Sequence, residues 1–504
     1  MHTALLLDMA AEAFPDRPAL GSLDDGIGLG ELAARARGGA AWLATQGEGT
    51  VVFLGLNGPA LPAAIFASGA LGRPFAPLNY RLPDDDLRRL LARTAPSVAV
   101  VDDDMLARVE GTPGVALVAR SAFEAACLDE ANRRAEPATD EPDIAVLLFT
   151  SGTTGEPKAA VLRHRHLASY VISTVEFMGS DEDEAALVSV PPYHIAGVSA
   201  VLTGIYGGRR IVHLSAFTPE AWVDAAAREG ITHAMLVPTM LGRVLDVLEA
   251  RRESLPRLRA LSYGGGRMPA AVIERALRLL PRVDFVNAYG LTETSSTISV
   301  LGPGDHRRAI ESEDPDVRRR LGSVGRPLPG LELEIRGLDG EVMPAGAVGE
   351  VHVRGEQVAG EYLDRKVIDD EGWFATKDSG WLDAEGYLFI DGRLDDVIVR
   401  GGENISPGEI EDVLRTHPQV ADVAVIGAPD EQWGERVAAV IVPRDGAPTP
   451  DELSAWVRAR LRSTKTPETY EFRSELPYNE TGKLLRRVLK QELAVHASAR
   501  EAAA

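Results

Sequence analysis

Apolar positions in the first third of the chain follow two different spacings, which predict helices and strands in alternation. Residues 3–14, 30–46, 59–69 and 84–94 repeat an apolar residue every three or four positions, as the buried face of a helix requires. Between them, apolar runs at 50–56, 75–78 and 97–102 predict buried strands. Strands that alternate with helices in this way favour a mostly parallel α/β sheet.

A second series of the same kind follows the polar stretch 129–143. It has strands at 186–190, 210–213, 233–237, 260–263 and 284–288, and helices at 195–207, 219–229, 239–250 and 269–280. The charged segment 302–320 predicts an exposed loop. From residue 324 the pattern changes to short alternating strands at 331–335, 349–354 and 387–391, and the glycine-rich turns between them predict a smaller β-rich subdomain.

The pattern changes once more after about residue 394. A helix at 407–416, strands at 420–427 and 437–443, a helix at 450–462 and a strand at 470–473 form a unit of domain size. We therefore predict an α/β protein. Its large N-terminal domain, 1–394, has two α/β subdomains with parallel-rich sheets and the small β-rich subdomain. A small α+β C-terminal domain, 395–504, follows.

Composition narrows the classes of function. A net charge of −22 argues against a nucleic-acid partner, which needs a basic face, but permits a local anion site. The single cysteine, Cys127, excludes an internal disulfide, and its helical surroundings favour a structural role over a nucleophilic one. The start of the chain reads as a helix rather than a secretory signal, and no run approaches the ~18–20 apolar residues of a membrane span. We expect a cytoplasmic protein.

Residues 144–158 carry the strongest chemical signal. Six apolar residues predict a buried strand, and Thr150-Ser151-Gly152-Thr153-Thr154-Gly155-Glu156-Pro157-Lys158 follows directly. Glycines allow a tight turn close to a ligand, backbone N–H groups and hydroxyls form an anion-binding concavity, and Lys158 adds a positive charge. The spacing is not that of the G-x-x-x-x-G-K-[ST] loop. The stretch therefore predicts a nucleotide-phosphate loop of another class.

Five further stretches stand out, each with an ordinary structural explanation when taken alone. They are 191–197, 262–269, 287–294, then 376–381 with 391–396 and 401–405, and 477–483. His194 alone is a packed histidine at a helix start, and Gly264–Gly266 alone is a strand-to-helix turn. Asp378 alone is a turn or cap residue. Lys483 alone is a solvated lysine near the C-terminus.

Together and in this order, the six stretches resemble the adenylate-forming superfamily, which holds acyl-CoA synthetases, adenylation domains of peptide synthetases and beetle luciferases. The resemblance runs from about residue 10 to about residue 490, and its most specific pieces are Thr150–Lys158 and Tyr289–Glu293. It implies that a carboxylate attacks the α-phosphate of ATP to give acyl-AMP and pyrophosphate, and that a thiol, usually that of CoA, then displaces AMP. The implied cofactors are ATP, Mg²⁺ and CoA.

The resemblance also implies residue roles. The loop Thr150–Lys158 would hold the β- and γ-phosphates, Thr292 would donate to the α-phosphate, and Glu293 would bind Mg²⁺, which prefers one or two carboxylates plus phosphate oxygens. Tyr289 and Gly264–Gly266 would enclose adenine. The remaining nucleotide-side positions are Asn287, Ala288 and Gly290 near adenine, and Asp378 with Arg393 at the ribose.

Two further expectations concern the C-terminal domain, which rotates between the half-reactions in such proteins. Lys483 would approach the α-phosphate and the carboxylate during adenylation. Rotation about a hinge at Asp395 would then withdraw it and bring in Gly401, Gly402 and Glu403 beside the CoA thiol. The hinge assignment rests on the resemblance alone, because a hinge needs no special side chain.

The chain departs from the family pattern at three positions. Lys377 stands where the family usually has glycine in Thr-Gly-Asp, which would put an extra charge near the nucleotide. Ala159 replaces a glycine after Lys158, a change we expect to be tolerated. Arg267 replaces an alanine, and it either points into solvent or pairs with a polar group of the acyl substrate.

We expect an acyl-CoA synthetase whose acyl pocket lies among His194, Val198, Tyr263, Gly265 and Arg267, with His194 as a gate or lining residue. A carrier-protein-loading ligase is an alternative, although the insertion of fatty-acid loaders is absent. An amino-acid adenylating protein would need an acid in 193–197, and none is present. A non-catalytic nucleotide-binding member would have lost Lys483 or Glu293. The identity of the acid stays open, and the sequence is compatible with a homodimer without deciding it.

Overall fold

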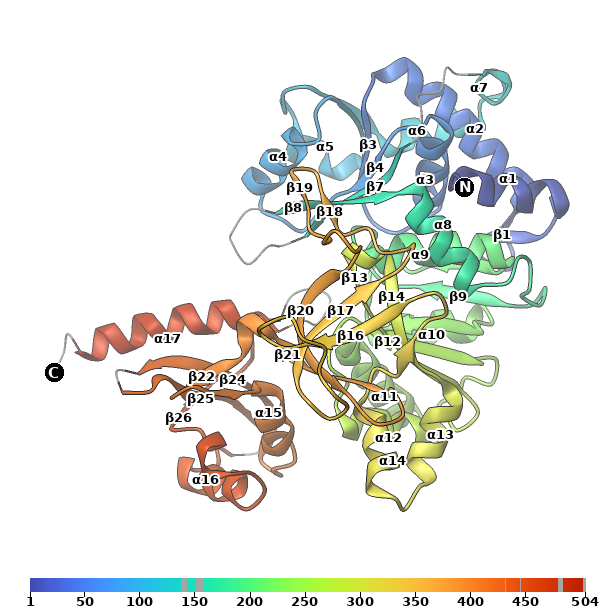
Figure 1. The fold of residues 1–504 in the computed structure, drawn as a ribbon. Coiled ribbons are helices and arrows are strands. Elements are labelled where there is room, and N and C mark those ends of the chain that lie inside the picture. The colour runs from blue at the N-terminus through green and yellow to red at the C-terminus, as the bar shows by residue number, and fades with distance from the viewer. Residues whose placement is uncertain (137–142, 151–156, 431, 445, 479–483, 502–504) are drawn as a thin grey trace.

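The computed structural model of the chain describes residues 1–136, 143–150, 157–430, 432–444, 446–478 and 484–501. Three sheets form the large N-terminal part, and a fourth sheet forms the C-terminal unit, drawn in orange and red in Figure 1. Among the described helices, none is long and apolar enough to cross a membrane.

The first sheet has eight strands within the described residues, in the order β19-β18-β8-β7-β4-β3-β5-β6. Its parallel strands are β3 (Thr50–Leu54), β4 (Phe75–Pro77), β5 (Ser97–Val101), β6 (Val115–Ala119) and β7 (Ile144–Thr150), and β8 (Lys158–Arg163) returns antiparallel to β7. Around it lie α1 (Ala4–Ala13), α2 (Leu29–Gln46), α3 (Ala60–Ala70), α4 (Asp84–Ala92), α5 (Leu106–Val109), α6 (Arg120–Leu128), α7 (Glu130–Arg134) and α8 (His164–Thr174). Cys127 is buried in this core, as predicted.

The second sheet has the order β15-β14-β13-β12-β11-β9-β10-β1-β2 over the described ranges. The strands are β1 (Pro18–Leu20), β2 (Ile27–Gly28), β9 (Ala185–Val188), β10 (Arg210–His213), β11 (His233–Leu236), β12 (Ala260–Gly264), β13 (Asp284–Leu291), β14 (Ser296–Leu301) and β15 (Arg326–Pro327). From β1 to β13 every neighbouring pair is parallel. The helices are α9 (Ile195–Gly207), α10 (Pro219–Arg228), α11 (Pro238–Arg251), α12 (Ala270–Leu279), α13 (Pro303–Glu311) and α14 (Pro315–Arg319).

The third sheet is antiparallel and lies between the two lobes and the C-terminal unit (Figure 1). It consists of β16 (Glu332–Arg336), β17 (Gly349–Arg354), β20 (Phe374–Leu382) and β21 (Leu388–Arg393), whereas β18 (Glu361–Tyr362) and β19 (Arg365–Lys366) join the first sheet. The C-terminal unit has β22 (Ile398–Arg400), β23 (Glu403–Ile405), β24 (Val420–Asp430), β25 (Gly434–Pro443), β26 (Thr469–Phe472), α15 (Pro407–Arg415), α16 (Pro450–Arg458) and α17 (Arg486–Glu501). This architecture confirms the predicted fold class.

The prediction of an exposed loop at 302–320 is wrong. This segment contains α13 and α14, and α13 buries His306 completely. The His306 ring pairs through Nε2 with the Tyr263 hydroxyl at 2.8 Å, and its Nδ1 lies 2.8 Å from the carbonyl of Gly302. The prediction missed α13 because most of its charged residues lie on its exposed face. Only a few of its residues, such as His306, make the buried contact.

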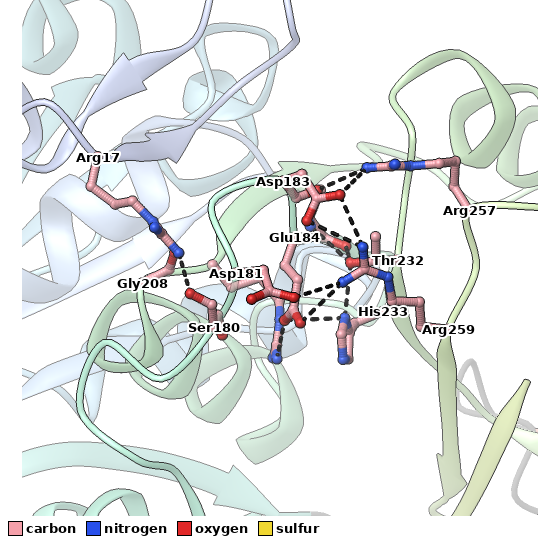
Figure 2. A network of polar contacts seen from close by, with 12 residues as sticks. Arg17, Ser180, Asp181, Asp183, Glu184, Gly208, Thr232, His233, Arg257 and Arg259 are labelled. Carbon is pink, nitrogen blue, oxygen red and sulfur yellow. Dashed lines mark hydrogen bonds and ion pairs between the residues drawn. The ribbon is translucent and has the colours of Figure 1, made fainter.

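A network of charged residues fastens the entrance to β9, as Figure 2 shows. Arg17 donates to the carbonyls of Gly208, at 2.8 Å, and Ser180. Asp183 pairs with Arg257 and Arg259, and both pairs are about half exposed, so each contributes little to stability. The network therefore orients the segment before β9 more than it stabilises the fold.

Five buried or partly buried histidines make the stability of the large N-terminal part depend on pH. Burial lowers the pKa from 6.5 to about 3 in His164 and to about 4 in His166, His194, His213 and His233. Between pH 6.5 and about 4 the unfolded chain binds protons on these rings and the folded chain does not. Stability therefore falls as the pH falls through this window. Burial raises the pKa of Asp8, Asp391 and Asp412, which acts in the opposite direction.

We predict that the thermal unfolding midpoint falls continuously from pH 7 to pH 4.5. Each net proton taken up on unfolding costs about 1.4 kcal/mol per pH unit. His164→Gln should reduce the number of protons taken up on unfolding by about one, because glutamine does not titrate in this range. The fold should survive, since the glutamine amide oxygen can accept the Thr3 N–H that now reaches Nδ1 at 3.2 Å. A midpoint that stays constant between pH 7 and pH 5 would contradict the assignment.

Candidate active site

A cavity of about 460 Å³ lies where the second sheet, the third sheet and the C-terminal unit meet. Its walls come from segments that are distant in the sequence. The large part contributes Gly264–Met268, Asn287–Leu291, Asp378 and Ile390–Arg393, and the C-terminal unit contributes Gly408, Glu411, Arg415, Asp422, Tyr478, Leu484 and Arg486. The cavity is complete only when the C-terminal unit is docked.

The floor of the cavity is bare backbone at the end of β12. A Cβ atom on Gly264 would lie 2.2 Å from the carbonyl oxygen of Ala288, so no side chain fits there. Gly265 has φ +77°, in the left-handed region that favours glycine. Gly266 has open space on its cavity side, because a Cβ there would meet nothing closer than 3.9 Å. A flat ring can therefore lie directly against this turn.

Tyr289, Asp378 and Arg393 form a hydrogen-bonded group in the wall. The Tyr289 hydroxyl donates to Oδ2 of Asp378 at 2.6 Å, and Nη1 of Arg393 donates to Oδ1 at 2.9 Å. Burial, together with the Asp378 carboxylate, holds the pKa of Tyr289 well above its usual range. The phenol therefore stays a donor, and the carboxylate keeps a fixed orientation toward the cavity.

Neighbouring positions on β13 are equally constrained. The Asn287 side chain is buried and donates to the carbonyl of Ser323 at 2.9 Å. A Cβ on Gly290 would lie 1.7 Å from the carbonyl oxygen of Ser296, which shows how closely β14 approaches. The predicted positions Asn287, Ala288, Tyr289 and Gly290 thus all line the same wall.

Lys377 does not add charge to the cavity, and that expectation is wrong. The side chain is exposed, and Lys377 is not among the cavity-lining residues. Its backbone has φ +62°, a conformation that glycine adopts freely and that costs other residues about 1–2 kcal/mol. The N–H donates to Oε1 of Glu350 at 3.0 Å. A glycine, which the resemblance implies at this position, would adopt this conformation without that cost.

Glu293 lies in a 3₁₀ turn, Thr292–Thr294, that follows β13 directly. It is 9% exposed, and its Oε1 accepts a hydrogen bond from the Tyr362 hydroxyl at 2.5 Å. Within the described residues no lysine or arginine forms an ion pair with it. A buried carboxylate without a cationic partner suits a metal ion. No group of three or more potential metal ligands occurs in the described part of the chain.

Both ends of the predicted phosphate loop are held in a β-hairpin. Thr150 and Lys158 are partners in the antiparallel pairing of β7 with β8, and the Thr150 hydroxyl lies 3.4 Å from the carbonyl of Lys158. Nζ of Lys158 lies 6.0 Å from the centre of the Tyr362 ring. The loop residues Ser151, Gly152, Thr153, Thr154 and Gly155 lie outside the described residues.

The predicted acyl-side residues do not converge as expected. Tyr263 is fully buried, its hydroxyl pairs with His306, and it is not among the described residues that line this cavity; its assignment to an acyl pocket stays a prediction. Val198 is part of the first core. The described wall of the cavity does not include His194, whose ring packs 4.6 Å from that of Tyr193 and whose buried Nε2 has no partner in the described part of the chain.

Arg267 is exposed, as the first of the two expectations has it, and its guanidinium also contacts the C-terminal unit; its pairing with an acyl substrate stays a prediction. It lines the cavity and forms an ion pair with Asp412 on α15. A Cβ on Gly408 would lie 2.2 Å from Nη1 of Arg267, so this glycine leaves the space that the guanidinium occupies. The contact joins the large part to the C-terminal unit.

The site residues predicted in the C-terminal unit belong to two segments, one near the C-terminus and one at the turn between β22 and β23. Lys483 lies outside the described residues, but Tyr478 and Leu484 on either side form an antiparallel bridge and both line the cavity. Gly401 and Gly402 have φ +57° and +82° and form the turn between β22 and β23, away from the described cavity wall. Glu403 pairs there with Arg462 at 3.3 Å.

Sequence reasoning missed Tyr362. It is a single tyrosine in a two-residue strand, 69 residues from Glu293. No spacing or composition signal links the two positions, so only the fold could reveal the contact.

Comparison with known proteins identifies the family of the chain. Residues 7–363 match the family described as "AMP-binding enzyme", and residues 409–483 match its C-terminal domain. The chain is 36% identical to feruloyl-CoA synthase of Amycolatopsis sp over 86% of this chain and 87% of the relative. It is 34% identical to indoleacetate–CoA ligase of Aromatoleum aromaticum, over 88% of each chain. A fatty acid–[acyl-carrier-protein] ligase of Streptomyces coeruleorubidus is 33% identical over 87% and 86%.

Among solved structures, o-succinylbenzoate CoA synthetase from Bacillus subtilis in complex with ATP and magnesium superposes with a TM-score of 0.80. That match has 28% identity and covers 96% of this chain and 98% of the other. The two family matches together span most of the sequence, and several relatives are more than 30% identical. The cavity also has the expected nucleotide-side residues. The chain belongs to the AMP-binding enzyme family, the adenylate-forming enzymes.

Proposed function

We propose that this protein is an AMP-forming acid–thiol ligase, an acyl-CoA synthetase that activates a carboxylic acid as acyl-AMP and transfers the acyl group to CoA. The observation that carries the proposal is the cavity between two units, lined by the glycine floor, Tyr289 and Asp378; Glu293, buried and without a cationic partner in the described part of the chain, follows directly after the strand that lines it. The CoA-ligase names of the relatives support it.

Each group of residues in the cavity and the loop has its own part of the nucleotide to bind. The turn Gly264–Gly266 and Tyr289 enclose the adenine ring, and Asp378, held by Arg393, accepts hydrogen bonds from ribose hydroxyls. The hairpin loop Thr150–Lys158 holds the terminal phosphates, and Thr292 donates to the α-phosphate. Glu293 would hold Mg²⁺, which would supply positive charge to neutralise the phosphates. Lys483 stabilises the charge that gathers at the α-phosphate and the attacking carboxylate, an effect of about 3–4 kcal/mol per donor in such sites.

We propose an acid with an aromatic ring as the substrate class. Three of the similar proteins are named for acids of this kind: ferulate, indoleacetate and o-succinylbenzoate. The start of α9 offers matching surfaces, because the rings of Tyr80 and Tyr193 meet edge to face at 5.5 Å and His194 packs on Tyr193. Burial and nearby Arg81 lower the pKa of His194 to about 4, so the ring that lines this region is neutral at pH 7.

A panel of carboxylic acids in a pyrophosphate-release assay tests the function and the substrate class together. We expect release with arylalkyl or arylalkenyl acids, ATP and Mg²⁺, and formation of the CoA thioester when CoA is added. Linear fatty acids of equal carbon number are the matched control, and we expect at least ~10-fold lower kcat/KM with them, since one misfitting group costs about 1–3 kcal/mol. Absence of acid-dependent release with every member would refute the function.

Carrier-protein loading is the second candidate, because one relative is a ligase for an acyl carrier protein. The same assay separates the two acceptors. Pyrophosphate release without a CoA thioester, together with acylation of a phosphopantetheinylated carrier, would favour the carrier over CoA.

Lys483→Ala should reduce acyl-AMP formation by ~10²–10³, because it removes a charge that acts only where negative charge builds up in adenylation. Thioester formation from supplied acyl-AMP should change far less. Both half-reactions are measured separately, by pyrophosphate release and by CoA consumption. An equal loss in the two would contradict the assigned role.

We propose that the domain boundary lies at 394/395 and that Asp395 is the hinge. Asp395 lies in the short 3₁₀ turn Leu394–Asp396 between the third sheet and the C-terminal unit, and Nζ of Lys490 lies 3.4 Å from its carbonyl oxygen. In the described arrangement Gly401–Glu403 are away from the cavity. A rotation about the turn that contains Asp395 would bring Gly401–Glu403 to the CoA thiol.

Asp395→Pro should keep adenylation and lose thioester formation, because proline fixes φ and blocks a backbone rotation. Asp395→Ala is the matched control and should keep both steps. The two half-reactions are assayed with ATP and with supplied acyl-AMP. A proline variant that is active in both would exclude Asp395 as the hinge.

A cytoplasmic location follows from the proposed use of ATP and CoA. The homodimer stays a prediction, which light scattering on the purified protein can check.

A further inference from the structure

We propose that Tyr362 is a positioning residue for the metal site: its hydroxyl fixes the Glu293 carboxylate, and its ring supports Lys158 at the end of the phosphate loop. This inference rests on the proposed function, in which Glu293 holds Mg²⁺ next to ATP phosphates. It assigns a role to a residue that no sequence signal singled out.

The first support is the isolation of the Glu293 carboxylate. Oε1 accepts the Tyr362 hydroxyl at 2.5 Å, and within the described residues no donor reaches Oε2. A buried carboxylate needs hydrogen bonds to stay in one orientation. Tyr362 satisfies one oxygen and leaves the other available, which is the arrangement that a single-carboxylate cation site requires.

The second support is the backbone carbonyl of Glu293 itself. Its carbonyl oxygen accepts from Ala359 N–H at 2.9 Å and from Gly360 N–H at 3.1 Å. Gly360 has φ +48°, and a Cβ there would lie 2.1 Å from Cγ2 of Ile368, so this approach needs glycine. The segment Ala359–Tyr362, which we term the strap, thus holds both the main chain and the side chain of Glu293.

The third support is the attachment of the strap to the phosphate-loop hairpin. Tyr362 pairs with Ala160 on β8, and Leu363 N–H donates to the carbonyl of Ala159 at 3.1 Å. The Tyr362 ring lies 6.0 Å from Nζ of Lys158 and 5.8 Å from the guanidinium of Arg365. Cations near a ring face are attracted to it.

The fourth support is a firm anchor beside Tyr362. Glu361 forms a bidentate ion pair with Arg163 at the end of β8, at 3.0 and 2.8 Å. Its side chain is 16% exposed, so this pair is partly shielded from water. Because neighbouring strand residues face opposite sides, anchoring Glu361 on one side fixes where the Tyr362 hydroxyl points on the other.

Tyr362→Phe tests the hydroxyl alone, since phenylalanine keeps the ring, the packing and both cation contacts. We expect the Mg²⁺ midpoint for pyrophosphate release to rise about 10-fold, as for other residues that orient a metal ligand. Mn²⁺ binding to the protein in complex with α,β-methylene-ATP is measured by electron paramagnetic resonance. The affinity for Mn²⁺ should fall by the same factor. Thioester formation from supplied acyl-AMP should stay within about two-fold of the unmodified chain.

Two controls separate positioning from general destabilisation. Tyr470→Phe removes another half-buried hydroxyl, 3.1 Å from that of Ser454, and should leave the metal midpoint unchanged. In a Glu293→Gln background, Tyr362→Phe should cause no further loss of Mn²⁺ affinity, because the ligand it orients is already gone. Thermal unfolding midpoints confirm that each variant is folded.

An unchanged Mg²⁺ midpoint and Mn²⁺ affinity in Tyr362→Phe would overturn the inference, as would an equal loss in the Glu293→Gln background. Failure of the proposed function gives a different result. The unmodified chain would then release no pyrophosphate with any acid, while Mn²⁺ binding would still report whether Tyr362 and Glu293 act together.

Discussion

The hydrogen-bonded group of Tyr289, Asp378 and Arg393 is the interaction on which the nucleotide cavity depends. It joins β13 of the second sheet to β20 and β21 of the third sheet, and β21 leads directly into the turn before the C-terminal unit. It holds the glycine floor that follows β12 and the Asp378 carboxylate on β20 at the same cavity. A buried donor and a cation that share one carboxylate give this junction a single geometry.

The chain has a net charge of −22, although ATP is itself highly anionic. Total charge matters less than the few groups that face the ligand, because salt screens exposed charges beyond about 8–10 Å. At the described site, Arg393 lines the cavity, and Lys158 stands at the end of the predicted phosphate loop. The acidic surface, by contrast, is paired extensively with arginines, as around Asp183 in Figure 2.

One contact between the large part and the C-terminal unit, the ion pair of Arg267 with Asp412, is weak. Arg267 and Asp412 are each a little over 40% exposed in their side chains, and ion pairs of that exposure contribute about 0–1 kcal/mol. Within the C-terminal unit the contacts are stronger: Glu411 is buried and accepts from the N–H of Val425 at 2.8 Å as well as from Arg486. A unit that is rigid in itself but loosely docked suits a reaction with two half-steps.

Local pattern determined much of this protein. Apolar spacing predicted the alternating strands and helices, because burial of one face imposes its period on the sequence whatever the partner. The glycine turn at 264–266 and the loop after β7 were recognisable because their chemistry is continuous in the chain. Tertiary structure alone decided which distant groups meet. The Tyr362–Glu293 bond, the outward position of Lys377 and the Arg267–Asp412 contact depend on sheet register and docking, and neither leaves a periodic trace in the sequence.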